Sequence, residues 1–229
     1  MSTDPSIPEP RRLSPVAYRL DLLRRRLALL GQSRATAEAS SNMEAEFRAR
    51  CAVMVEPVVL ELGTRRSQEG RSTMHTDWVP HAAEFLGTDM EPGVDVDIVA
   101  DLHRLTEATG TERFDVILTC STFEHIRYPW LASHELMKAL KVGGQLYLQT
   151  VQSFPLHGYP SDYYRFSREA LASLFPAGMN FNVVATNYDF PIRIHSRRDS
   201  TLQHHPAFLN STLWGEKTGP TPAEFVYEL

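Results

Sequence analysis

Short apolar runs alternate with amphipathic or polar stretches along most of the chain. Runs of strand length lie at residues 58–62, 85–89, 94–99, 114–119, 145–151 and 181–185, with a weaker one at 224–228. Helical spacing of apolar residues follows several of these runs, at 70–82, 130–140 and 167–175. Strands that alternate with helices imply right-handed crossovers, so the pattern predicts an α/β protein with a mainly parallel sheet and helices on both faces.

The N-terminal quarter has a different pattern. Residues 1–10 are rich in proline and polar residues, which is typical of a disordered tail. Apolar residues then recur at helical spacing over 15–30 and again over 40–55. We therefore expect an N-terminal helical cap at residues 12–55 that packs on the sheet and is able to close over a bound ligand.

Length and composition favour one domain with one core. The chain has 229 residues, of which 42% are hydrophobic and 22% charged. We divide it into a tail and helical cap (1–55), a core (56–190) and a polar lid that includes the weak last strand (191–229).

Charge and cysteine content exclude several classes of function. The net charge is −5, so the chain has no basic field for nucleic acid, and a small-molecule substrate fits better. Two cysteines are too few for a disulfide framework, which favours a reducing compartment. Because the chain has no signal-peptide pattern and no run as long as a membrane span, we expect a cytoplasmic protein that does not contact membrane.

Acidic residues and a glycine follow the first three predicted strands. Glu61 and Gly63 end the first strand, and Asp89 ends the second. Parallel sheets bind ligands outside the carboxyl ends of their strands, where a carboxylate such as Asp89 can accept hydrogen bonds from a ribose diol. Asp101 follows the third strand and has two interpretations, a contact to an adenine amino group and an N-cap of the segment that begins at Leu102.

The ordered set of these motifs resembles the class I S-adenosylmethionine-dependent methyltransferases. The match covers roughly residues 55–190 and is closest to a small-molecule branch, the methyltransferase type 11-like proteins, in which a Glu-His pair opens the helix after strand four. The motifs that carry the resemblance are Glu61-Leu-Gly63, Asp89, Asp101, the segment 114–126 (Phe-Asp-Val-Ile-Leu-Thr-Cys-Ser-Thr-Phe-Glu-His-Ile) and the segment 140–148 (Leu-Lys-Val-Gly-Gly-Gln-Leu-Tyr-Leu).

The resemblance implies a fold and a cofactor. The fold would be a Rossmann-like, doubly wound, seven-stranded sheet with an antiparallel last strand, and the cofactor would be S-adenosylmethionine. By position, the residues near the cofactor would be Glu61, Gly63, Thr64 and Arg65 at the methionine part, Asp89 and Met90 at the ribose and adenine, Asp101 and Leu102 at the adenine, and Cys120 and Ser121 along the sulfonium side.

One departure from the family pattern concerns the loop after Gly63. The family usually has two further glycines, at the positions that Arg65 and Ser67 occupy here. Arginine permits neither positive φ nor close approach of the backbone to a ligand, so the loop must take another path. Two hypotheses follow: Arg65 or Arg66 pairs with the cofactor carboxylate, or the site is degenerate and the protein is no longer a methyltransferase.

The segment 152–166 follows the fifth strand and combines aromatic and polar residues, as expected for the lining of a substrate pocket. His157 is the first candidate for a general base, because imidazole accepts a proton at neutral pH, and His125 is the second. Asp162 is a third catalytic candidate, although Asp162 and Arg165 also fit a structural lock that pins the loop. The candidate substrate-binding residues are Tyr159, Tyr163, Tyr164 and Arg165.

Two further clusters carry weaker signals. Cys120 near His125 could suggest a cysteine nucleophile, but a core thiol at the strand end is the better interpretation. The polar tail contains His195, His204 and His205, which could form a metal site with Asp162, yet their spacing does not support one. We therefore expect no metal, and a lid or oligomer contact, with a homodimer as one arrangement.

These observations predict a methyltransferase that acts on the oxygen or nitrogen of a small-molecule acceptor, with natural products as one class of acceptor. Two alternatives stay open. The fold can serve isomerisation or cyclisation, in which the cofactor only shapes the pocket, or the chain can be a non-catalytic binding partner of another enzyme.

Overall fold

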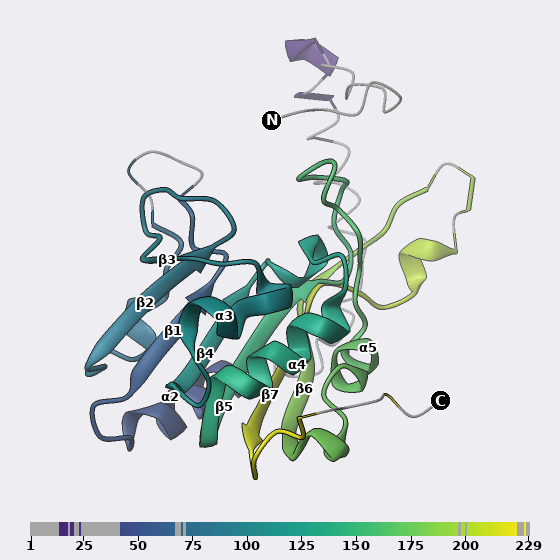
Figure 1. The fold of residues 1–229 in the computed structure, drawn as a ribbon. Coiled ribbons are helices and arrows are strands. Elements are labelled where there is room, and N and C mark those ends of the chain that lie inside the picture. Colours follow the sequence, from purple (N-terminus) through teal and green to yellow (C-terminus); the bar gives the residue numbers. More distant parts are fainter. Residues whose placement is uncertain are drawn as a thin grey trace.

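The computed structural model describes residues 14–17, 19, 20, 23, 42–66, 70, 72–196, 198, 199, 201–223 and 227. Its centre is one seven-stranded sheet with the strand order β3-β2-β1-β4-β5-β7-β6 (Figure 1). The strands are β1 Val58–Leu62, β2 Glu84–Asp89, β3 Ile98–Val99, β4 Phe114–Cys120, β5 Leu140–Val151, β6 Phe181–Ile192 and β7 Ala207–Lys217.

Helices of both α and 3-10 type connect or cover these strands. The α-helices are α2 Met43–Ala52, α3 Leu105–Thr109, α4 Pro129–Ala139 and α5 Arg168–Ser173. The 3-10 helices are η1 Thr76–Trp78, η2 Leu102–Arg104, η3 Phe123–His125, η4 Ala177–Met179 and η5 Leu202–His204.

Strand directions confirm the predicted mainly parallel, seven-stranded α/β fold. Strands β1 to β5 pair in parallel, whereas β7 lies antiparallel to both β5 and β6. In the register of the sheet, Leu62 of β1 lies opposite Thr88 of β2 and Thr119 of β4. The carboxyl ends of these three strands therefore lie at one edge of the sheet, where such folds bind their ligands.

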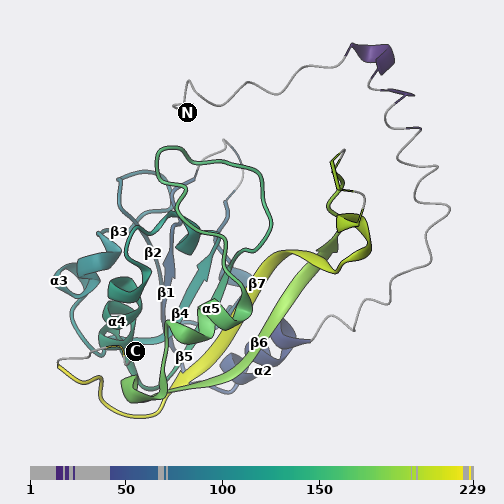
Figure 2. The ribbon, with the colours of Figure 1, turned by 90° about the vertical axis from the view of Figure 1, so that its right-hand side faces the viewer.

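Each face of the sheet packs against its own helices, as Figure 2 shows with α3 and α4 on one side and α2 on the other. Helix α2 contributes Met43, Phe47 and Cys51, all at most 2% exposed, to the core on its face. Helices α3, α4 and α5 fill the core on the other face. The prediction that the second N-terminal helix packs on the sheet is thus confirmed.

The first N-terminal helix lies largely outside the described residues. The residues described within 15–30 are helical, but Val16, Leu20 and Leu23 are all more than half exposed. For these three side chains, the expected packing on the sheet is not found.

The crossover helix predicted over 70–82 is wrong. In the described part of this segment the structure has only the 3-10 turn η1. The backbone N–H of His75, which an α-helix would direct to the carbonyl four residues earlier, instead donates to the Glu61 carboxylate at 2.8 Å. A tertiary hydrogen bond therefore replaces the helical one.

Several strand boundaries also differ from the predictions, and β6 runs seven residues beyond the predicted 181–185. The third strand is limited to Ile98–Val99, and β5 includes the turn predicted at 142–144. The last strand is Ala207–Lys217 and not 224–228, of which only Tyr227 is described. The hydrophobic pattern did not predict β7, because three of its buried mid-strand residues are polar, namely Asn210, Ser211 and Thr212. Of these, Ser211 donates a hydrogen bond to the Phe166 carbonyl at 2.9 Å.

Candidate active site

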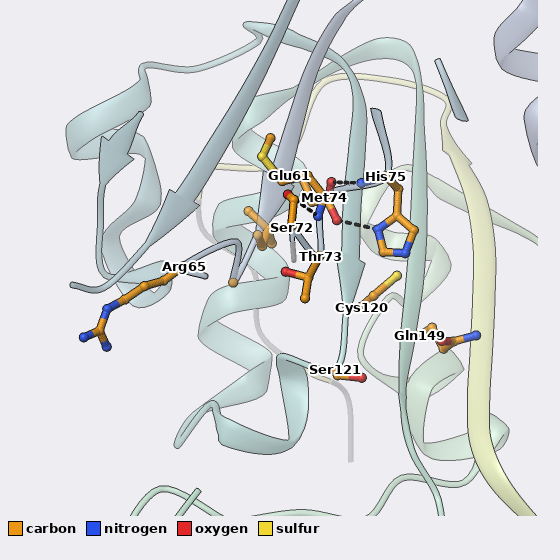
Figure 3. Close-up of a pocket in the computed structure, with 11 residues that line it drawn as sticks. Glu61, Arg65, Ser72, Thr73, Met74, His75, Cys120, Ser121 and Gln149 are labelled. Carbon is orange, nitrogen blue, oxygen red and sulfur yellow. Dashed lines mark hydrogen bonds and ion pairs between the residues drawn. The ribbon is translucent and has the colours of Figure 1, made fainter. Parts of the chain in front are cut away.

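A cavity of about 520 Å³ opens at the edge where β1 and β4 end. Figure 3 shows its lining, which comes from the end of β1, the end of β4, one residue of β5 and the segment before η1. The lining residues are Glu61, Leu62, Gly63, Arg65, Ser72, Thr73, Met74, His75, Cys120, Ser121 and Gln149. Five of the predicted cofactor residues, namely Glu61, Gly63, Arg65, Cys120 and Ser121, therefore line one cavity.

Gly63 makes the turn out of β1 in a conformation that requires glycine. Its φ is +72°, and its N–H donates to the carbonyl of Thr88 at 2.8 Å. A Cβ atom at this position would lie 2.2 Å from the Thr122 hydroxyl oxygen. The absence of a side chain thus allows the end of β1 to contact the segment after β4.

The buried Glu61 and the partly exposed His75 form a pair in the cavity wall (Figure 3). The Glu61 side chain is 4% exposed and lies 2.6 Å from His75 Nδ1, and its other oxygen accepts the His75 backbone N–H. The hydrogen bond to Glu61 raises the pKa of His75, and burial opposes this effect. Sequence reasoning missed His75, because a histidine in a polar loop carries no signal until its partner is known.

Both arginines of the loop after Gly63 are paired with protein carboxylates. Arg66 donates two hydrogen bonds to Asp95, at 2.8 and 2.9 Å, which lower the pKa of the Asp95 carboxyl. Arg65 lies 2.5 Å from Glu91 and points away from the other lining residues (Figure 3). The geometry favours a role of these arginines in holding the loop against the segment after β2, rather than in pairing with a ligand carboxylate.

The remaining predicted cofactor residues are not among those that line the cavity. Asp89 ends β2, and its carboxylate accepts a hydrogen bond from the Glu91 backbone at 3.1 Å. Asp101 caps η2 by accepting from the His103 N–H at 2.9 Å, so the N-cap interpretation is confirmed. The other three differ in exposure: Met90 is exposed, whereas Leu102 and Thr64 are buried.

Cys120 does not have the properties of a catalytic nucleophile. Burial raises the pKa of its thiol, and the nearby carboxylate of Glu61 raises it further. The thiol is therefore protonated at neutral pH, which agrees with the interpretation as a strand-end thiol.

A second cluster lies directly after β4, where η3 carries Glu124 and His125. The Glu124 side chain is fully buried, and its Oε2 accepts a hydrogen bond from the Thr150 hydroxyl at 2.6 Å. Its Oε1 lies 3.7 Å from His157 Nε2 and 3.9 Å from His125 Nε2. Within the described part of the chain, Oε1 has no hydrogen-bond partner. The structure thus brings together the two histidines that the sequence selected, around a glutamate for which it predicted no role.

Asp162 and Arg165 lock the loop between β5 and α5, which rises beyond the end of the sheet in Figure 2. Arg165 donates to both carboxylate oxygens of Asp162, at 2.6 and 2.9 Å, and the His157 backbone N–H donates to Asp162 at 3.0 Å. The hydrogen bond with Arg165 lowers the pKa of Asp162 to about 2. Asp162 is therefore a fully paired anion at neutral pH, which favours the structural lock over a role in proton transfer.

The tyrosines of this loop divide into two kinds. Tyr159 and Tyr163 are 45% and 44% exposed, so their rings are available to a ligand. The Tyr164 hydroxyl instead donates to the Arg127 carbonyl at 3.0 Å. Of the predicted substrate-binding set, Tyr164 and Arg165 thus have structural partners.

The histidines of the polar tail lie apart from this cluster. His195, His204 and His205 are exposed, and among the residues that the structure describes they form no metal-ligating group with Asp162. No helix in the described ranges is long and apolar enough to cross a membrane.

Comparison with known proteins defines the class. Residues 64–148 match the family described as a methyltransferase domain. The 1,6-didemethyltoxoflavin-N1-methyltransferase of Burkholderia thailandensis is 15% identical with a TM-score of 0.52, and the alignment covers 96% of this chain and 99% of that one. An S-adenosylmethionine-dependent methyltransferase of Archaeoglobus fulgidus is 12% identical with a TM-score of 0.53, over 78% and 95% of the two chains.

A further solved structure has different chemistry. The [4+2]-cyclase SpnF is 14% identical with a TM-score of 0.52, and the alignment covers 90% of this chain and 96% of that one. A search of curated protein sequences found no match. The sheet order and the position of the cavity at the ends of β1 and β4 define the class I methyltransferase fold.

Proposed function

We propose that the chain is an S-adenosylmethionine-dependent methyltransferase that acts on an oxygen or nitrogen of a small-molecule acceptor. The observation that carries the proposal is the cavity at the ends of β1 and β4, bordered by the bare Gly63 turn. Its volume of about 520 Å³ lies within the range of small-molecule sites, roughly 300–1,000 Å³. The match of residues 64–148 to a methyltransferase domain supports the same activity.

The residues at this edge fit the chemical groups of the cofactor. The buried carboxylate of Glu61 suits the ammonium group of the methionine part, although His75 already occupies both of its oxygens. Asp89, at the end of the neighbouring strand, suits the ribose diol. Asp101 retains one oxygen, Oδ2, whose nearest charged partner in the described ranges is Arg104 at 3.9 Å, and this oxygen suits the adenine amino group.

Methyl transfer does not require the protein to form a covalent bond with the cofactor or the acceptor. The bound cofactor would supply an electrophilic methyl group on a sulfonium; the acceptor lone pair forms the new bond to carbon while the carbon–sulfur bond breaks, and its electron pair stays on sulfur. The protein must hold the acceptor about 3 Å from the methyl carbon and provide for loss of the acceptor proton. We assign this second task to the acceptor-side cluster, which consists of Glu124, His125 and His157.

Variants at two positions test cofactor binding and methyl transfer separately. Asp89→Ala should weaken binding of S-adenosylhomocysteine, because the ribose diol loses its acceptor, and isothermal titration calorimetry measures this. His157→Ala should bind S-adenosylhomocysteine normally but lower turnover. Turnover is measured as methyl incorporation from labelled S-adenosylmethionine into a panel of phenols and aromatic amines. If neither the wild-type chain binds S-adenosylhomocysteine nor any acceptor gains a methyl group, the proposal fails.

A second candidate function is a reaction that does not transfer the methyl group. The likeness to the cyclase SpnF, at the same TM-score as the toxoflavin methyltransferase, favours keeping it. Product mass separates the two candidates, because methylation adds one methyl group and an isomerisation or cyclisation adds nothing. A homodimer, a cytoplasmic location and a role as a binding partner of another enzyme stay predictions from the sequence.

A further inference from the structure

Three electron-pair donors converge in the acceptor-side cluster. Glu124 Oε1, His125 Nε2 and His157 Nε2 come from η3 and from the loop between β5 and α5. Their ligand atoms all lie within 4.8 Å of one another. Glu124 is fully buried, and in the described structure its Oε1 accepts no hydrogen bond. A buried carboxylate oxygen without a partner is costly, so this one suits a cation or a hydrogen-bond donor.

The backbone fixes which nitrogen of each imidazole carries the proton. His125 Nδ1 lies 2.5 Å from the Ser161 carbonyl, and His157 Nδ1 lies 3.1 Å from the Pro155 carbonyl. A carbonyl oxygen can only accept, so Nδ1 of each ring is the donor, and Nε2 of the neutral ring has a lone pair. Both lone pairs are directed to the same side as Glu124 Oε1, at distances too long for hydrogen bonds.

We propose that Glu124, His125 and His157 bind a divalent transition-metal ion such as Zn²⁺. Two imidazoles and one carboxylate form a donor set that suits zinc, iron(II) or cobalt(II) better than magnesium or calcium. Donor atoms about 2.1 Å from a tetrahedral ion lie roughly 3.4 Å from one another. The two separations from Glu124 Oε1, 3.7 and 3.9 Å, are a few tenths of an ångström above that value, and the two Nε2 atoms, which lie within 4.8 Å of each other, approach it when the rings rotate.

The surrounding structure orients these donors. The Thr150 hydroxyl binds Glu124 Oε2 and so leaves Oε1 for the ion. The carbonyls that bind Nδ1 of the two histidines fix the tautomer, as hydrogen bonds to metal-ligating histidines commonly do. Gly158 has a φ of +63°, and a Cβ there would lie 2.6 Å from His125 Cε1, so only glycine lets the loop close over this ring. These contacts preorganise the site without an ion.

The consequence for chemistry rests on the proposed function. An ion with three protein ligands keeps at least one coordination position open for an acceptor oxygen or a water molecule. Coordination lowers the pKa of a hydroxyl, which then loses its proton to solvent or buffer. His157, which the sequence suggested as a general base, is in this arrangement a ligand. The inference also replaces the expectation that the site holds no metal.

The test measures metal binding separately from activity. The full chain is stripped with a chelator and titrated with Zn²⁺ by calorimetry, and native mass spectrometry gives the stoichiometry. We expect one ion per chain, and at least tenfold weaker binding in Glu124→Gln, His125→Gln and His157→Gln. His195→Ala, which removes an exposed histidine of the polar tail, is the matched control and should bind as the wild-type chain does. Co²⁺ should give visible absorption bands that the three ligand variants lose.

The outcomes distinguish the metal site from the methyltransferase. Because Glu124 is fully buried, Glu124→Gln can misfold, so circular dichroism checks the fold of each variant. His157 lies on a loop, so His157→Gln tests the site even if Glu124→Gln does not fold. Zn²⁺ binding that the ligand variants do not change overturns the inference. So does a nuclear magnetic resonance spectrum in which both nitrogens of both histidines carry protons in the presence of Zn²⁺. Methyl transfer by a chain that binds no metal overturns the metal site and leaves the proposed function. Metal binding without methyl transfer overturns the proposed function and leaves the metal site.

Discussion

The two sides of the end of β4 treat their charged groups differently. On one side, the arginine loop, residues 63–66, pairs Arg66 with Asp95 and Arg65 with Glu91. On the other side, the acceptor-side cluster contains a fully buried carboxylate oxygen that has no hydrogen-bond partner in the described part of the chain. The arginine loop departs from the family pattern, whereas the Glu-His pair of the cluster conforms to it. The arginines that depart from the family pattern therefore have carboxylate partners within the protein. The carboxylate oxygen without a partner belongs to Glu124, where the sequence follows the pattern.

This difference distinguishes charged groups that stabilise the fold, such as Arg66 and Asp95, from polar groups that are available to a ligand, such as Glu124 Oε1. Paired charges fix the conformation of the arginine loop and leave its glycine turn free to border the cavity. The acceptor-side cluster instead has lone pairs that a cation or a hydrogen-bond donor can satisfy. The predictions below test whether the arginine loop and the lock beside the cluster are structural, in order of decreasing effect.

The largest effect is expected at Gly63. Gly63→Ala should lower the free energy of unfolding by about 3 kcal/mol, from strain at positive φ together with overpacking against Thr122. Thr122 cannot easily yield, because its β-branched side chain is stiff and its hydroxyl donates to the Leu62 carbonyl at 3.2 Å. Urea denaturation measures the loss.

A second glycine provides the control for Gly63. Gly143 has a φ of +83°, and among the described residues no atom lies within 4 Å of a Cβ built on it. Gly143→Ala therefore adds the strain without the contact and should cost about 1–2 kcal/mol. Equal losses for the two variants would mean that Thr122 moves aside, and the close approach at Gly63 would then not be required.

Asp162 is expected to give the next largest effect. Asp162→Asn should cost about 2 kcal/mol at pH 7, because it breaks a charged, two-point hydrogen bond that is almost fully buried on the Asp162 side. The folded-state pKa of Asp162 is lowered to about 2, so its contribution is present above the unfolded pKa of about 3.9 and is lost as the pH falls through 2. Urea denaturation at pH 7 and near pH 2 should show the wild-type chain and the variant converging at the lower pH.

An exposed pair between an arginine and a carboxylate is the control for Asp162. Arg168 and Glu169 lie 2.8 Å apart, and their side chains are 46% and 66% exposed. Glu169→Gln should leave the free energy of unfolding nearly unchanged, because water screens the pair. A cost at Asp162 no larger than this would show that the lock does not hold the loop.

The sequence predicted the sheet and the edge at which the cavity opens, because both depend on local patterns. An apolar run followed by Glu61 and Gly63 marks a buried strand and its turn regardless of what packs around it. Strand β7 and the segment before η1 were not predictable, since buried hydroxyl groups and the tertiary bond from His75 to Glu61 decide them.

The candidate site shows the same limit. Sequence spacing selected His125 and His157, which lie 32 residues apart, yet no pattern could show that both direct Nε2 to one oxygen of Glu124. The pairing of Arg66 with Asp95 was equally hidden, because the partner lies across a strand. Such contacts depend on how distant segments pack, which a single sequence does not encode locally.

The two arginines offer a smaller test of the comparison. Arg66→Ala should lower the free energy of unfolding and weaken binding of S-adenosylhomocysteine, because the loop loses its two hydrogen bonds to Asp95. Arg65→Ala should change both quantities little, since its pair with Glu91 is about half exposed. Denaturation and calorimetry give the two measurements. Weaker binding in Arg65→Ala alone would restore the hypothesis that Arg65 pairs with the cofactor carboxylate.

The smallest effect is the pH dependence of the pair between His75 and Glu61. Its hydrogen bond raises the pKa of His75 above 6.5, so the stabilisation is complete below pH 6.5 and is lost as the pH rises through the folded-state pKa. The wild-type chain should exceed His75→Gln in unfolding free energy by about 1 kcal/mol at pH 6, and by less at pH 9. Because a charged His75 competes with a ligand ammonium for Glu61, S-adenosylhomocysteine should bind relatively better to His75→Gln at pH 6 than at pH 9. A difference that stays constant between these pH values would mean that His75 binds Glu61 as a neutral donor, and the Glu61 carboxylate would then be no more available to an ammonium group at high pH than at low pH.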